Sequence, residues 1–127
     1  MKENLLLAIT SLLSILFMTF HLADDIVRGF EKGGVATLLA LPVLVIWLYG
    51  ALVLAERRSG HVIMLLGSLL GMLVPVLHMT GQRIGEIARS SGGFFFIWTL
   101  IALGVTALTS VILSVRGLWS LRRELPD

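Results

Sequence analysis

Residues 4–23 read NLLLAITSLLSILFMTFHLA and contain no charged side chain. Three further uncharged segments follow, at 33–55, 59–82 and 90–115. Each has about twenty residues or more, and at a rise of ~1.5 Å per helical residue each spans a hydrocarbon layer about 30 Å thick. The pattern therefore predicts four transmembrane helices, at about 4–23, 34–55, 60–80 and 93–116.

The composition agrees with a membrane protein. Apolar residues make up 57% of the chain and charged residues 14%, which is more apolar surface than a water-soluble core of this length can bury. We expect an all-α fold, a four-helix transmembrane bundle with up-down-up-down topology, that forms one integral membrane domain over residues 1–127. The four spans use nearly the whole chain, so any chemistry takes place within the bundle or at its ends.

Lysine and arginine near the span ends predict the orientation, because basic loops remain in the cytoplasm. The side that carries both chain ends has six basic residues and the other side has four. The first group is Lys2, Arg57, Arg58, Arg116, Arg122 and Arg123, and the second is Arg28, Lys32, Arg83 and Arg89. We expect a multi-pass protein of the inner (plasma) membrane with both termini in the cytoplasm. Since the basic residues stand singly or in pairs beside the spans, the bilayer is the expected partner and nucleic acid is not.

Several classes of activity lack the residues that they require. The chain has no cysteine, which excludes disulfides, thiol redox relays and thiolate metal sites. No acidic residue stands in mid-span to drive proton-coupled drug export, and no lysine stands in a span to form a retinal Schiff base. We assign no catalytic residue and favour a binding, sensing or accessory subunit over an enzyme.

One set of polar residues stands out at the outer ends of the first and third spans. His21, Asp24 and Asp25 are spaced i, i+3 and i+4, so the imidazole shares a helix face with a carboxylate, and His78 reaches the same membrane level. Two imidazoles and one or two carboxylates suit zinc, manganese or ferrous iron. The sequence thus predicts an outward-facing site at His21, Asp24, Asp25 and His78 that binds a divalent metal or relays protons.

Other interpretations of the same residues remain open. Asp24 and Asp25 are also typical of a membrane boundary, with Asp24 paired to Arg28 one turn later. The two histidines also fit side chains that extend into the headgroup layer. A further alternative is a single haem b with His21 and His78 as axial ligands, although buried carboxylates next to the macrocycle argue against it.

A competing hypothesis is a structural scaffold, either a homo-oligomer or a partner of another membrane subunit. Lipid gives helices no hydrophobic reason to associate, so small residues that allow close approach mark the contact faces. The third span has Gly67, Ser68 and Gly71 on such a face. The fourth span has a strip spaced by four residues, formed by Ala102, Thr106, Ser110 and Ser114. We expect both faces to contact other helices.

Overall fold

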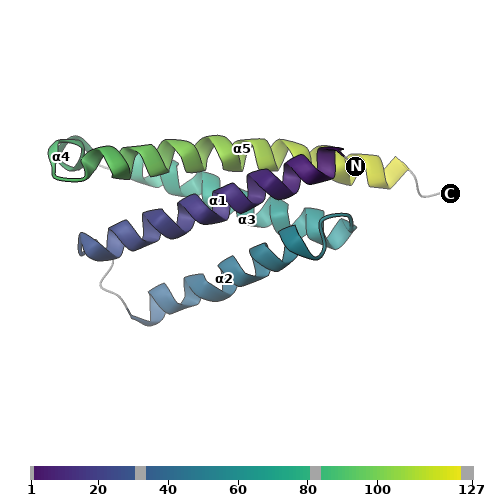
Figure 1. Cartoon of the computed structure of the whole chain (residues 1–127), viewed down its shortest axis with the longest axis horizontal. Helices are drawn as coiled ribbons and strands as arrows, with labels where there is room; N and C mark the ends of the chain where they lie inside the picture. Colours follow the sequence, from purple (N-terminus) through teal and green to yellow (C-terminus); the bar gives the residue numbers. More distant parts are fainter. Residues whose placement is uncertain (1, 31–33, 81–83, 124–127) are drawn as a thin grey trace.

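The computed structural model of the chain describes residues 2–30, 34–80 and 84–123. This part of the chain is all-helical and contains no strand (Figure 1). The helices are α1 (Lys2–Val27), α2 (Val35–Leu52), α3 (Arg58–Met79), α4 (Ile84–Arg89) and α5 (Gly93–Arg123).

Three of these helices, α1, α3 and α5, are long and apolar enough to cross a membrane. The remaining predicted span is α2, whose 18 residues correspond to about 27 Å of helix. It ends at Leu52 and not at the predicted residue 55, because residues 53–57 form the turn into α3. This turn is tight, since a Cβ atom on Gly60 would collide with the Leu54 carbonyl.

Helices α1 and α5 both continue past the predicted ends of their spans. Helix α1 runs through Asp24 and Asp25 to Val27, and the chain then turns at Gly29, whose φ of 71° favours glycine. Helix α5 continues to Arg123, as residues 117–123 contain no proline. An uncharged segment marks the part of a helix that suits lipid, whereas backbone hydrogen bonding continues into the polar residues on either side.

Helix α5 packs along both α1 and α3, and α2 also packs against α1 and α3 (Figure 1). The start of α1 and the end of α5 lie at the same end of the molecule, where Arg116 Nη2 donates to Glu3 Oε1 over 2.6 Å. The short helix α4 lies at the opposite end, next to the start of α5. Of the basic residues that predict the orientation, Lys32 and Arg83 lie outside the described residues.

The predicted small-residue face of α3 does contact other helices. Gly67 lies directly against the indole of Trp47 in α2, and a Cβ atom at this position would overlap three atoms of that ring. A Cβ atom on Gly71 would come within 3.2 Å of the same indole and 3.3 Å of Ala107 Cβ in α5. Glycine at these positions therefore allows α3 to approach both neighbours closely.

The predicted strip of α5 contacts two helices through hydroxyl groups, which confirms it as a packing face. Ser110 Oγ lies 2.7 Å from Ser11 Oγ of α1 and accepts a hydrogen bond from Ser68 Oγ of α3 over 2.8 Å. Ser14 of α1 donates to Thr106 Oγ1 over 3.0 Å. Ser11, Ser68 and Ser110 are fully buried, so the hydrogen bonds among them satisfy hydroxyl groups that water does not reach.

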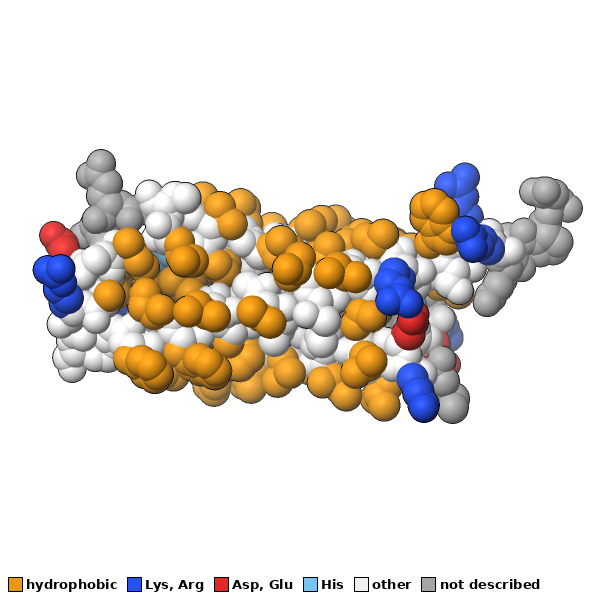
Figure 2. Space-filling model, turned by 90° about the horizontal axis from the view of Figure 1, so that it is seen from above, with side chains coloured by type: hydrophobic (Ala, Val, Ile, Leu, Met, Phe, Trp, Pro, Cys, Tyr) orange, Lys and Arg blue, Asp and Glu red, His pale blue; other side chains and the backbone are white. Residues whose placement is uncertain are grey.

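The outer surface separates into an apolar middle and charged ends. Figure 2 shows hydrophobic side chains over the central zone and the charged side chains at the two ends of the molecule. Leu39, Leu66 and Ile101 are between 49% and 64% exposed. So much exposed apolar surface is unusual for a protein that faces water, and it agrees with the three helices of membrane-spanning length.

Candidate functional site

The structure brings His21, Asp25 and His78 together at the end of the molecule that carries α4. His21 and Asp25 belong to consecutive turns of α1, and His78 belongs to the last turn of α3. The two imidazole rings meet edge to face, with 4.8 Å between their centroids. Because α1 continues past residue 23, Asp25 follows His21 by one helical turn on the same face of α1. Both side chains face His78 of α3.

One carboxylate oxygen lies between the two imidazoles. Asp25 Oδ2 is 3.5 Å from His21 Nε2 and 3.4 Å from His78 Nε2. One ligand atom from each of the three residues lies within 4.8 Å of the other two. We call these three residues the His/Asp cluster. Both distances exceed the usual length of an N–H···O hydrogen bond, about 2.7–3.2 Å, so a small cation between these atoms would not displace tight hydrogen bonds.

The proton on His78 is fixed by the backbone of its own helix. His78 Nδ1 lies 2.9 Å from the carbonyl oxygen of Val74. A carbonyl oxygen can only accept, so Nδ1 carries the hydrogen and Nε2 of the neutral ring has a lone pair. That lone pair is on the side of Asp25 Oδ2. A histidine that ligates a metal commonly has its other nitrogen bonded to a carbonyl in this way.

Helix α5 orients His21 in a similar way. The hydroxyl of Thr99 donates to the Phe96 carbonyl over 2.9 Å, which uses its single hydrogen. Thr99 Oγ1 is also 3.4 Å from His21 Nδ1, a contact as long as those to Asp25, and in this contact the oxygen can only accept. With the hydrogen on Nδ1, Nε2 of the neutral His21 ring has a lone pair as well, and this nitrogen is buried and makes no hydrogen bond within the described part of the chain. Three lone-pair atoms, two imidazole nitrogens and one carboxylate oxygen, thus converge on one small volume.

Asp24 does not join the cluster, although the sequence predicted it as a ligand. Its Oδ2 accepts from Arg28 Nε over 2.6 Å, as the boundary interpretation expected. The same guanidinium reaches the segment before α5, donating to Ser90 Oγ over 2.9 Å and to the Ser91 carbonyl over 3.2 Å. Asp24 therefore holds Arg28 in a contact between the end of α1 and the start of α5.

The cluster is closed on one side by an aromatic ring. Phe96 is fully buried, with its ring centroid 4.9 Å from that of His21 and 5.8 Å from that of His78. The guanidinium of Arg28 lies 5.6 Å from the centroid of the same ring. The side chain of His21 is 2% exposed, whereas that of His78 is 31% exposed. A ligand from outside would therefore enter next to His78.

Sequence reasoning missed Phe96 and Thr99, because both belong to a helix that begins about seventy residues after His21. Thr99 is a polar residue in an uncharged span, which is the one local signal that marks it. Comparisons with protein-family models, with curated proteins and with solved structures give no match to this chain.

Proposed function

We propose that this chain is a multi-pass protein of the inner membrane, an up-down-up-down bundle of α1, α2, α3 and α5 with both termini in the cytoplasm. The apolar central zone and the three helices of membrane-spanning length support this proposal. The basic residues of α5 support the orientation. Arg122 and Arg123 lie in its last turn, at the end that also carries the start of α1, and Arg116 contacts Glu3 there. The His/Asp cluster then faces the outer side of the membrane.

Within this topology, we propose that the protein is a binding, sensing or accessory subunit whose His/Asp cluster holds a divalent metal ion or a transferable proton. The observation that carries the proposal is the convergence of three lone-pair atoms from His21, Asp25 and His78. Lone pairs repel one another at such distances, and a cation or a proton between them removes the repulsion. Buried ionisable groups in a membrane span are costly, so their presence favours a functional role.

The two separations from Asp25 suit a small divalent ion, and the three ligand atoms together span no more than 4.8 Å. With metal–nitrogen and metal–oxygen bonds of about 2.0–2.1 Å, two ligands of a tetrahedral site stand about 3.3 Å apart. The separations from Asp25 Oδ2 to the two histidine nitrogens, 3.5 and 3.4 Å, are close to that value. Two imidazoles and one carboxylate suit zinc, ferrous iron or manganese and leave coordination positions open.

The two alternatives have weaker support. Axial ligation of haem b requires the imidazoles on opposite faces of a flat macrocycle, whereas the rings of His21 and His78 contact each other directly. A scaffold requires small-residue faces that are available to a partner. The faces centred on Gly67 and Ser110 are covered by helices of the same chain.

Metal analysis of the full chain, purified in detergent and equilibrated with zinc, manganese or ferrous iron, tests the proposal. We expect about one bound ion per chain, with loss of that ion in His21→Ala, His78→Ala and Asp25→Asn. Two control variants should retain it. The first, His61→Ala, removes a buried histidine of α3 whose ring, like that of His78, contacts a backbone carbonyl, here that of Arg57. The second, Asp24→Asn, removes the carboxylate next to Asp25, which pairs with Arg28.

The proton form of the proposal has its own measurement. If the wild type binds no ion, nitrogen NMR of the histidines should show His21 and His78 changing protonation in a coupled manner, because their ring centroids lie only 4.8 Å apart. An ion-free protein whose histidines titrate independently would show that the cluster has neither role.

A further inference from the structure

The last turns of α5 form a second polar feature, at the opposite end of the molecule from the His/Asp cluster. Helix α5 has 31 residues, about 46 Å of helix, which exceeds a hydrocarbon layer of about 30 Å. Figure 1 shows its C-terminal part extending beyond the start of α1. When the apolar zone lies in the bilayer, this part of α5 lies at the level of the lipid headgroups.

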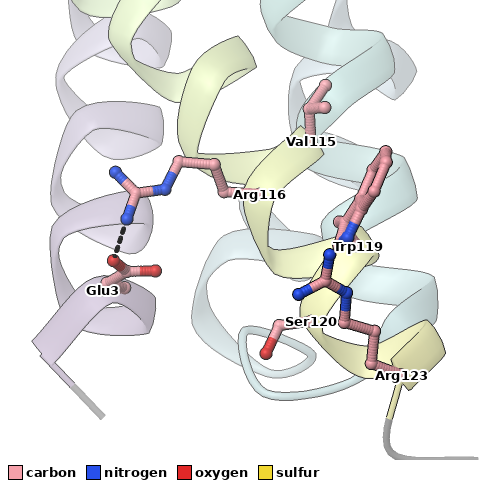
Figure 3. A pocket seen from close by; sticks show the side chains of 6 residues that line it. All are labelled: Glu3, Val115, Arg116, Trp119, Ser120 and Arg123. Carbon is pink, nitrogen blue, oxygen red and sulfur yellow. Dashed lines mark hydrogen bonds and ion pairs between the residues drawn. The ribbon is translucent and has the colours of Figure 1, made fainter.

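A pocket of about 370 Å³ opens on this part of the helix (Figure 3). In the view of Figure 3, Glu3 and Arg116 lie on one side, Trp119 and Arg123 lie on the other, and Ser120 lies between them. Val115 completes the lining, one turn nearer to the apolar zone. The pocket therefore combines cationic groups, a hydroxyl group and an apolar wall.

The charged groups of the pocket are arranged by neighbouring side chains. The contact from Arg116 to Glu3 uses Nη2, and a guanidinium has further N–H donors on Nε and Nη1. The guanidinium of Arg123 lies 5.4 Å from the ring centroid of Trp119, which holds it over an aromatic face. Two arginines and one glutamate line the pocket, so its net charge is +1, and Arg122 adds a further positive charge beside it.

We propose that this pocket binds the headgroup phosphate of an anionic phospholipid. Arginine pairs with phosphate through parallel N–H···O hydrogen bonds, and Arg116 and Arg123 supply such donors on either side of Ser120. Trp119 is 63% exposed and suits the headgroup layer, while Val115, 47% exposed, borders the acyl chains. Basic pockets next to transmembrane helices on the cytoplasmic side are typical sites for anionic headgroups.

This site is separate from the His/Asp cluster and does not depend on metal or proton binding there. Its experiment uses the full chain in a neutral detergent, with phosphatidylglycerol, phosphatidylcholine or soluble glycerol phosphate added. Native mass spectrometry counts the retained lipids, and the shift of the melting temperature, Tm, measures stabilisation. The variant is Arg116→Gln combined with Arg123→Gln, and the matched control is Arg89→Gln, an exposed arginine at the end of α4.

We expect phosphatidylglycerol to raise the Tm and to be retained, more than phosphatidylcholine at equal concentration, and the effect to fall with added salt. The double variant should lose more than half of the Tm shift and of the retained lipid, while Arg89→Gln keeps both. Equal effects of the two lipids, or an unchanged double variant, would overturn the proposal. A full Tm shift with glycerol phosphate alone would also overturn it, because the ligand would then be a soluble phosphate.

Discussion

Replacing Thr99 with valine should weaken metal binding to the His/Asp cluster without removing any ligand. Valine resembles threonine in shape but has no oxygen to accept the hydrogen on His21 Nδ1. The neutral imidazole can then place its hydrogen on Nε2, the atom that faces Asp25. Metal binding would first have to move that hydrogen back, so the affinity falls although all three ligands remain.

The size of this effect follows from the length of the contact. Loss of a partner that orients a metal ligand reduces affinity by about 10- to 100-fold. The distance from His21 Nδ1 to Thr99 Oγ1 is 3.4 Å, longer than in a strong hydrogen bond. We therefore expect the lower limit, a roughly tenfold increase in Kd, or about 1.4 kcal/mol.

Competition titration against a coloured chelator, with the purified protein in detergent, measures this Kd. The control is Thr106→Val, the same change two turns later in α5, where the hydroxyl contacts Ser14 and not the cluster. Thr106→Val should bind metal as the wild type does, and Thr99→Val should reach full occupancy at higher metal concentration. Unchanged affinity in Thr99→Val, or an equal loss in Thr106→Val, would refute the argument that Thr99 sets the tautomer of His21.

Two further predictions concern the packing of the helices. Ser110→Ala removes two buried interhelical hydrogen bonds, each worth about 0.6 kcal/mol in a membrane protein, and should lower the free energy of unfolding by about 1 kcal/mol. The control is Thr109→Ala, which removes an exposed hydroxyl of the same helix and should change the free energy of unfolding little. An equal loss in this variant would contradict the role of Ser110. Gly67→Ala forces the Trp47 indole to move and should destabilise the protein by about 1–3 kcal/mol. Gly104→Ala meets only Pro75 at ordinary contact distance and should be neutral or stabilising. In denaturant titrations only Gly67→Ala should therefore lower the free energy of unfolding, and an equal loss in Gly104→Ala would contradict the importance of the Trp47 contact.

The uncharged segments predicted the positions of the four longer helices, because length and apolar composition follow directly from the bilayer. Three of these helices, α1, α3 and α5, have the length and composition of a membrane span. The uncharged segments predicted the ends of the helices less well. Val53, Leu54 and Ala55 are as apolar as the residues before them, yet they belong to a turn whose tightness depends on Gly60. Hydropathy contains no information on that close backbone contact.

For the candidate site, the sequence predicted which histidines meet but not which carboxylate accompanies them. Asp24 and Asp25 both share a face with His21, and the choice between them depends on the side from which α3 approaches α1. That direction is set by contacts along the whole length of the helices, and helical spacing alone does not contain it. Arg28 was predicted as a partner of Asp24, and the structure confirms this pair.

The hydroxyl of Ser110 has a geometrical consequence for the distant end of the molecule. Its contacts hold Ser11 of α1 and Ser68 of α3 at the same level along the long axis of the bundle. His21 follows Ser11 by ten residues, and His78 follows Ser68 by ten residues. Helices α1 and α3 run in the same direction (Figure 1). Equal rises of about 15 Å therefore bring both imidazoles to one level. A sliding motion of either helix relative to α5 would have to break a serine contact before it could separate the histidines.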